Sequence, residues 1–189
     1  MNVGLPGRAD HAARTHIVVV LVAGVAGSGK TTIGGLLAGR LGWSFTDGDS
    51  LHPAANIAKM AAGHPLTDED RRPWLAAIEA WMDQRIGAGD PAVMACSALK
   101  RRYRDQLLGG RPNAAMAFLL IDREVVATRL AARRGHFIDP RLVDSQFADL
   151  EPPAPDEPSV VALLETGSPE ETAGQIAGRL GLVGRAKDQ

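Results

Sequence analysis

One stretch of eight residues, 24–31, constrains the fold of this chain more than any other. It reads G-x-x-x-x-G-K-T and follows an apolar run at residues 17–22. A pattern typical of an α-helix, over residues 31–41, comes directly after it. A strand, a glycine-rich turn and a helix in this order form a loop whose backbone N–H groups converge on phosphate. The sequence therefore predicts a nucleoside triphosphate site between the first strand and the first helix.

Each residue type in this loop has a physical role. Glycine lets the backbone curl around an anion, and the following helix directs the positive end of its dipole at the same point. Lys30 is expected to reach the β- and γ-phosphates, and the Thr31 hydroxyl is expected to bind Mg²⁺. The residues predicted to bind ATP here are Gly24, Ala26, Gly27, Ser28, Gly29, Lys30, Thr31 and Thr32.

Length and charge narrow the class of protein further. A chain of 189 residues is expected to form one domain with a substantial core. Because 21 Lys and Arg nearly balance 22 Asp and Glu, no overall field favours nucleic acid or an anionic membrane. The single cysteine, Cys96, suits a reducing cytoplasm. Arg14 and the apolar run after it resemble part of a signal peptide, but the run is too short to span a bilayer and leads into the phosphate loop.

Strand patterns alternate with helix patterns along the chain. The expected strands are residues 17–23, 43–46, 91–96, 115–121 and 160–164. The expected helices are residues 31–41, 53–62, 101–108, 124–134 and 169–180, with a longer helix that ends at Gly87. That longer helix has two candidate starts, Thr67 as an N-cap and Pro73 in a first turn. This alternation predicts an α/β fold with a parallel sheet.

The remaining segments set the predicted domain limits. Residues 1–15 are interpreted as a flexible N-terminal extension, residues 16–184 as the single domain and residues 185–189 as a C-terminal tail. Residues 135–150 lack strong periodicity and are interpreted as a mobile flap. Residues 151–158, with four prolines, are interpreted as an extended connector.

Other motifs discriminate among the proteins that carry phosphate loops. The guanine-reading N-K-x-D motif of GTPases and the L-S-G-G-Q-like stretch of transporter ATPases are absent from the sequence. Asp47 and Asp49 instead follow the second strand, at the edge of the sheet where ligands bind in open α/β folds. Alternation lets one carboxylate approach the metal while the other orients a substrate hydroxyl and accepts its proton. We therefore interpret the two aspartates as part of the active site of a small-molecule kinase, and not as a solvated turn without function.

Several segments together resemble the thermoresistant gluconokinases, small kinases that phosphorylate D-gluconate at O6 with ATP. They are residues 47–53 (DGDSLHP), Asn56 with Lys59 and Met60, residues 65–68 (PLTD), 71–75 (RRPWL), 96–100 (CSALK), 103–105 (YRD) and 135–137 (GHF). The resemblance runs from about residue 19 to residue 180. It implies the fold shared with shikimate and adenylate kinases: a five-stranded parallel sheet of order 2-3-1-4-5, helices on both faces, a substrate-binding subdomain at about residues 50–87 and a lid at about 134–155.

The resemblance also implies roles for individual residues. Asp49 would orient and deprotonate the acceptor hydroxyl, and Asp47 would assist Thr31 at Mg²⁺ through water. The fork of the Arg71 guanidinium suits a carboxylate. The residues expected to bind gluconate are Asp49, His52, Arg71, Ser97, Lys100, Arg104 and His136.

On the ATP side, the resemblance places Arg129 against the adenine. Arg133, or its neighbour Arg134, would swing in with the lid and neutralise charge on the transferring phosphoryl group. The catalytic residues are thus expected to be Lys30, Asp49 and Arg133. Relatives are commonly dimers, so a cytoplasmic homodimer that acts on ATP and D-gluconate is expected, without a nucleic acid or membrane partner.

Two alternatives remain open from the sequence. The acceptor can be shikimate or another small hydroxy acid, although the DGDSLHP and CSALK segments favour gluconate. The chain can also be a non-catalytic ATP-sensing module, although a sensor has no need of a residue that deprotonates an acceptor. Three features depart from the family pattern: the long N-terminal extension, the basic pair Arg101 and Arg102, and the residues after GHF.

Overall fold

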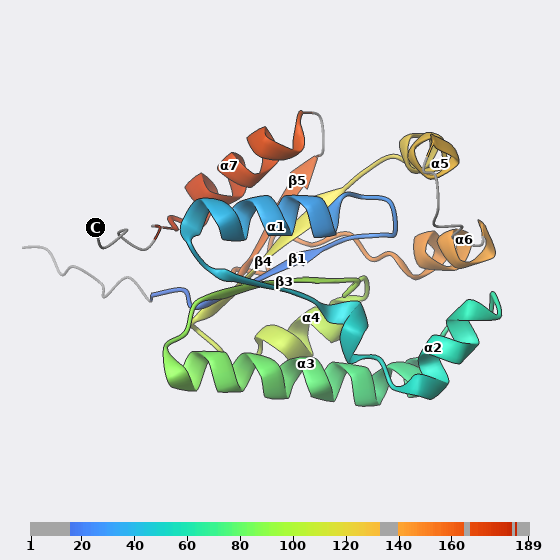
Figure 1. The fold of residues 1–189 in the computed structure, drawn as a ribbon, viewed down its shortest axis with the longest axis horizontal. Helices are drawn as coiled ribbons and strands as arrows, with labels where there is room; N and C mark the ends of the chain where they lie inside the picture. The colour runs from blue at the N-terminus through green and yellow to red at the C-terminus, as the bar shows by residue number, and fades with distance from the viewer. Residues whose placement is uncertain (1–15, 133–139, 165–166, 183, 185–189) are drawn as a thin grey trace, which may run out of the picture.

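A five-stranded parallel sheet forms the centre of the molecule (Figure 1). The computed structural model describes residues 16–132, 140–164, 167–182 and 184. The strands are β1 (Val19–Ala23), β2 (Ser44–Asp47), β3 (Ala92–Cys96), β4 (Ala114–Leu120) and β5 (Val160–Leu164). Their order is β2-β3-β1-β4-β5, and every neighbouring pair is parallel. The predicted fold class and strand order are confirmed.

Helices cover both faces of this sheet. They are α1 (Lys30–Leu41), α2 (Ala54–Ala61), α3 (Asp68–Ala88), α4 (Arg101–Leu108), α5 (Arg123–Ala132), α6 (Pro140–Asp149) and α7 (Pro169–Arg179), with a 3₁₀ turn, η1 (Gly48–Leu51), after β2. Figure 1 shows α1 and α7 on one face and α3 and α4 on the other. It also shows α2, α5 and α6 gathered beyond one end of the sheet. That is the end where β1 enters the phosphate loop, so these three helices surround the predicted site.

The two faces of the sheet have separate apolar cores. Leu21 of β1 packs in the core that contains Trp74 and Ile78 of α3. Its neighbour Val22 packs on the opposite side, in the core that contains Ile33 of α1 and Ile176 of α7. Successive side chains of a strand point to opposite faces, so a strand covered on both sides must be apolar throughout. The run of apolar residues in β1 is continuous because both of its faces are buried.

A capping box fixes the start of α3. The Thr67 hydroxyl accepts a hydrogen bond from the Asp70 backbone N–H at 3.3 Å, and the Asp70 carboxylate accepts one from the Thr67 N–H at 2.7 Å. Two N–H groups without a partner inside the helix are satisfied in this way. Of the two candidate starts, Thr67 is therefore correct, and Pro73 lies inside the helix.

The predicted flap is partly a helix. Residues 140–149 form α6, a helix that was not predicted within the segment interpreted as a mobile flap. Val143 is buried in the same core as Trp74, which explains why the segment orders against the domain. The predicted N-terminal extension (1–15), the predicted C-terminal tail (185–189) and residues 133–139 lie outside the described residues. Within the described part, no helix combines the length and apolar character needed to cross a bilayer.

Candidate active site

The loop between β1 and α1 forms an anion cradle. Gly24 has a φ of +145°, and a Cβ at this position would lie 2.8 Å from the Leu119 carbonyl oxygen, so no larger residue fits without strain. Gly29 is left-handed and precedes the first residue of α1. Lys30 Nζ donates a hydrogen bond to the Val25 carbonyl at 2.8 Å, which folds its side chain back over the loop. The helix dipole and the Lys30 ammonium group both favour a phosphate here.

Asp47 links β2 to the phosphate loop. Its Oδ2 accepts a hydrogen bond from the Thr31 hydroxyl at 3.1 Å, and its Oδ1 accepts one from the Asp49 N–H at 3.0 Å. A hydroxyl and a carboxylate side by side are the hard oxygen ligands that Mg²⁺ prefers beside phosphate. Among the described residues, no cluster of three or more His, Cys, Asp or Glu side chains suits a metal ion. These two oxygens therefore fit a magnesium ion that is held mainly by phosphate and water.

Gly48 sets the position of Asp49. A Cβ on Gly48 would lie 2.7 Å from the Ala95 carbonyl oxygen, so glycine allows the chain to pass against the end of β3. The Trp74 indole N–H donates a hydrogen bond to the Gly48 carbonyl at 2.9 Å, from the other side. The turn that carries Asp49 is thus held between β3 and α3.

His52 stacks on the same tryptophan. The two rings are 4.7 Å apart between centroids and 9° from parallel. Burial lowers the pKa of His52 below its ordinary value of 6.5, and the positive charge of Arg71 acts in the same direction, while Asp49 opposes both. The neutral imidazole is therefore favoured at neutral pH, where it can donate to or accept from a substrate hydroxyl.

A cleft of about 640 Å³ contains most of the predicted site residues. The predicted residues that line it are Ala26, Gly27, Gly29, Lys30, Thr31, Thr32, Asp47, Asp49, His52, Arg71, Ser97 and Arg129. Residues that were not predicted to bind a ligand also line it, among them Trp74, Leu142 and Gln146. The structure thus brings the phosphate loop, the two aspartates and Arg71 to one cavity. Its volume suits a nucleotide and a small acceptor.

Gly24, Ser28, Lys100 and Arg104 are not among the lining residues. Gly24 and Ser28 belong to the buried base of the loop, and the fully buried Ser28 hydroxyl has no hydrogen-bond partner among the residues that the structure describes. Arg133 and His136, the two remaining predicted residues, fall in the segment 133–139 and lie outside the described residues.

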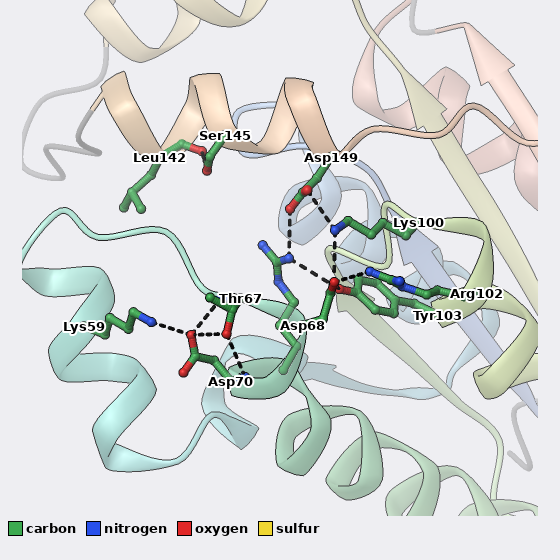
Figure 2. A network of polar contacts seen from close by, with 11 residues as sticks. Lys59, Thr67, Asp68, Asp70, Lys100, Arg102, Tyr103, Leu142, Ser145 and Asp149 are labelled. Atoms are coloured by element: carbon green, nitrogen blue, oxygen red, sulfur yellow. Dashed lines mark hydrogen bonds and ion pairs between the residues drawn. The ribbon is translucent and has the colours of Figure 1, made fainter.

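Lys100 lies behind the cleft in a network of charges (Figure 2). Its ammonium group is 3.0 Å from Asp68 and 2.9 Å from Asp149. Asp149 also pairs with Arg71, at 2.8 Å between Oδ2 and Nη1. Burial lowers the pKa of Lys100, but the hydrogen bonds with Asp149 and Asp68 outweigh this effect and raise it. Lys100 is therefore linked to Arg71, which lines the cleft, through the Asp149 carboxylate that both cations contact.

Arg104 was predicted to bind the substrate, but its side chain is buried in an ion pair away from the cleft. Its Nε and Nη2 each bond to one oxygen of Glu157, at 2.7 and 2.9 Å, and both side chains are almost fully buried. Its Nη1 donates to the backbone carbonyls of Leu99 and Glu151, each at 2.9 Å. The structure therefore does not support the prediction that Arg104 binds the substrate. The guanidinium instead ties the segment after α6 to α4.

The helix α6 closes the cleft above the phosphate loop. Gln146 Oε1 accepts a hydrogen bond from the Ala26 backbone N–H at 2.6 Å, across 120 residues of sequence. Leu142 and Ser145 of the same helix line the cleft. Sequence reasoning missed Gln146 and Asp149, because nothing in the local pattern of residues 140–149 indicates which side chains point inward.

Comparisons with known proteins agree with this geometry. Residues 19–153 match the family described as AAA domain. The chain is 50% identical over 143 residues to a protein named gluconokinase from Gluconobacter oxydans (strain 621H), which covers 75% of this chain and 79% of that protein. It is 40% identical over 174 residues to the thermoresistant gluconokinase of Escherichia coli (strain K12). This alignment covers 91% of this chain and 95% of that protein.

Solved structures give the same result. A sugar kinase from Janibacter sp. HTCC2649, crystallised without ligand, has a TM-score of 0.82 and 43% identity, over 88% of this chain and 95% of that one. A gluconokinase from Sinorhizobium meliloti 1021 has a TM-score of 0.78 and 38% identity, over 89% and 93% of the two chains. Sequence identity and overall shape therefore point to the same group of proteins.

Proposed function

The chain belongs to the gluconokinase family, and from this premise we propose that it transfers the γ-phosphoryl group of ATP to O6 of D-gluconate. The observation that carries the proposal is that the phosphate loop and Asp49 line one cleft, together with the cationic Arg71. A phosphoryl donor and an anionic polyol can then meet in a single cavity. The products are ADP and 6-phospho-D-gluconate.

We propose that the phosphate loop binds ATP through its backbone N–H groups and Lys30. Arg129 lines the cleft from α5, a position that suits contact with the adenine ring. Thr31 and Asp47 would hold Mg²⁺, with Asp47 acting through water. The metal, when bound, supplies positive charge to the β- and γ-phosphate oxygens. We also propose that Arg133 brings a further positive charge to the phosphoryl group during its transfer.

On the acceptor side, Asp49 orients the O6 hydroxyl and accepts its proton. The acceptor oxygen forms a bond to the γ-phosphorus as the bond from that phosphorus to the β,γ-bridging oxygen breaks, and the electron pair of that bond leaves with ADP. Arg71 binds the carboxylate of gluconate, while His52 and Ser97 meet its hydroxyls. Exclusion of water from the closed cleft protects ATP from hydrolysis.

The proposal extends to the organisation of the molecule. Residues 50–87 act as the substrate-binding subdomain and residues 134–155 as the lid, and each of these segments contributes to the lining of the cleft, through Arg71 and Gln146. A homodimer in the cytoplasm is proposed from the resemblance to the family. Light scattering on the purified protein would give the mass of the assembly, and a monomer would contradict the dimer.

A coupled assay of ADP release tests the function directly. Gluconate, shikimate, other sugar acids and nucleoside monophosphates are compared as acceptors at equal concentration, with Mg²⁺ present and absent. Gluconate is expected to give the highest kcat/KM, and turnover is expected to require Mg²⁺. Turnover with gluconate below a tenth of that with another acceptor would contradict the substrate assignment. ATP binding without turnover of any acceptor would favour an ATP sensor.

A further inference from the structure

Asp149 pairs with Arg71, the cation that the proposed function assigns to the substrate, and with Lys100 beside it. It is the last residue of α6, and its two oxygens bind different partners: Oδ2 is 2.8 Å from Arg71 Nη1, and Oδ1 is 2.9 Å from Lys100 Nζ. Figure 2 shows Asp149 reaching from α6 toward Lys100, with Asp68, Arg102 and Tyr103 beside it. A carboxylate that bridges a guanidinium and an ammonium group is bound as a sugar-acid carboxylate would be.

The contact is shielded from water. The side chains of Arg71, Lys100 and Asp149 are 13%, 15% and 26% exposed. Ion pairs with this degree of burial are screened less than surface pairs. Loss of Asp149 from Arg71 therefore has to be compensated by another negative charge.

The two cations differ in their other partners. Lys100 keeps Asp68 as a second carboxylate, at 3.0 Å. Hydrogen bonds from Tyr103, Arg102 and Lys100 hold the pKa of Asp68 well below its ordinary value, so this carboxylate stays ionised. Arg71 has a different environment: among the described residues, its second hydrogen-bond partner is a hydroxyl, that of Tyr103 at 3.4 Å, and not a second carboxylate. When Asp149 leaves, Arg71 is the cation whose charge needs a new partner.

Charge then decides which acceptors can enter. A substrate carboxylate that reaches Arg71 is repelled by Asp149 and attracted by the same cations, so it replaces Asp149 with no net loss of charge pairing. A neutral polyol or sugar that displaces Asp149 leaves Arg71 without a negative partner. Specificity of this kind uses an internal competitor to reject the wrong ligand.

We propose that Asp149 is a specificity-determining residue: it holds Arg71 and Lys100 until an anionic acceptor replaces it, and so excludes neutral polyols and sugars. The inference rests on the proposed function, because it takes Arg71 as the group that binds the carboxylate of the acceptor. It assigns a task to α6 beyond covering the cleft.

The test compares gluconate with D-glucitol, which has a similar chain of hydroxyls and no carboxylate. Steady-state kinetics are measured for the parent and for Asp149→Asn with saturating ATP and Mg²⁺. The variant is expected to lower the KM for gluconate several-fold and to raise kcat/KM for D-glucitol, so that the preference for gluconate narrows tenfold or more. The matched control is Asp144→Asn, on the same helix, where the exposed Asp144 pairs with Arg123. This control is expected to keep the preference of the parent.

The possible results separate the inference from the proposed function. A parent that does not phosphorylate gluconate contradicts the proposed function. A parent that does so, with an unchanged preference in Asp149→Asn, contradicts the inference alone. A higher KM for gluconate in the variant with no gain on D-glucitol also contradicts it, because Asp149 would then only position Arg71. Calorimetric titration of gluconate into each protein without ATP checks the competition directly, and tighter binding by Asp149→Asn is expected even if the variant turns over slowly.

Discussion

Asp47 and Asp49 are separated by one residue, yet their surroundings differ. Both oxygens of Asp47 accept hydrogen bonds, from the Thr31 hydroxyl and from the Asp49 N–H. The carboxylate of Asp49 belongs to a residue that lines the same cleft. Asp47 thus links β2 to the phosphate loop, and Asp49 lies two residues further on, where an acceptor hydroxyl in the cleft can reach it. This difference supports separate roles at the metal and at the acceptor hydroxyl.

Replacing the two aspartates separately should separate these roles. Asp49→Asn is expected to lower kcat by about 10²- to 10⁴-fold, because an amide cannot accept the hydroxyl proton. The KM for ATP should change little. Asp47→Asn is expected to raise the Mg²⁺ concentration needed for half-maximal rate. Initial rates measured over a range of Mg²⁺ and ATP concentrations check both, and equal loss of kcat with the same Mg²⁺ dependence in the two variants would contradict the division of roles.

The two arginines on neighbouring helices provide a second test. Arg104→Met is expected to destabilise the fold by about 3–5 kcal/mol, because the buried Glu157 carboxylate loses its partner. The folded variant should retain the KM for gluconate. Arg71→Met is expected to raise that KM strongly with a smaller effect on stability, since Arg71 lines the cleft. Urea unfolding and steady-state kinetics on both variants check the contrast, which would fail if Arg104→Met raised the KM as much as Arg71→Met.

Sequence patterns predicted the residue types at the site better than their positions. The phosphate loop and the Asp47–Asp49 turn were predictable because each is a local motif whose chemistry depends on adjacent residues. Arg104 was not, because its partner Glu157 is 53 residues away and nothing local shows that both are buried. Gln146 was missed for the same reason, since its contact with Ala26 spans 120 residues.

At the scale of secondary-structure elements, the first turn of α3 connects helix stability to substrate binding. Thr67 caps the helix, and Arg71 follows four residues later, one turn into α3. A second capping box, formed by Ser168 and Glu171, begins α7 on the far face of the sheet from α3. Both caps satisfy backbone N–H groups in the same way, although Asp70 also pairs with Lys59. Their helices carry different residues, and α3 is the one that carries Arg71.

Removing each cap in turn tests whether the start of α3 matters for substrate binding as well as for stability. Thr67→Ala and Ser168→Ala are each expected to lower the free energy of unfolding by about 1 kcal/mol. Only Thr67→Ala should raise the KM for gluconate, because fraying of this helix end releases Arg71. Urea unfolding with kinetics on the folded proteins gives both quantities. An equal change in KM for the two variants would mean that general destabilisation, and not the position of Arg71, affects binding.

The helix α6 shows where prediction of elements failed. Its ten residues contain three large apolar side chains, Leu142, Val143 and Phe147, and this weak periodicity did not lead to a predicted helix. The helix is fixed by distant partners instead: Val143 packs in the α3 core and Asp149 pairs with Arg71 and Lys100. Helices held mainly by tertiary contacts are poorly indicated by local sequence.

At the scale of the whole molecule, the parallel sheet explains why distant residues meet. The phosphate loop follows β1, Asp47 and Asp49 follow β2, and Ser97 follows β3. The carboxyl ends of parallel strands lie at one edge of the sheet, and β2, β3 and β1 are adjacent. The segments that follow these strands therefore meet because of the sheet topology alone. The topology was therefore predictable from the alternation of strands and helices, together with the family resemblance that gave the strand order.

The stability of the whole domain should depend on pH through His52. Burial lowers its pKa in the folded state below the ordinary 6.5, so between these two pKa values the unfolded chain binds more protons than the folded one. Stability therefore falls as the pH drops below about 6.5, by at most about 1.4 kcal/mol per pH unit for one proton. Glu157 acts in a lower range: hydrogen bonds from Arg104 depress its pKa, so its contribution is complete above its ordinary 4.5 and is lost at more acidic pH.

The free energy of unfolding, measured with urea between pH 7.5 and 5.0, consequently reports the contribution of His52 without that of Glu157. The parent is expected to lose stability across this range, and His52→Gln is expected to show a flatter profile, because glutamine does not titrate. His64→Gln, at an exposed position, serves as the control and should follow the parent. A parent profile that does not fall below pH 6.5, or a His52→Gln profile as steep as that of the parent, would show that the ring stacked on Trp74 accepts a proton without loss of stability.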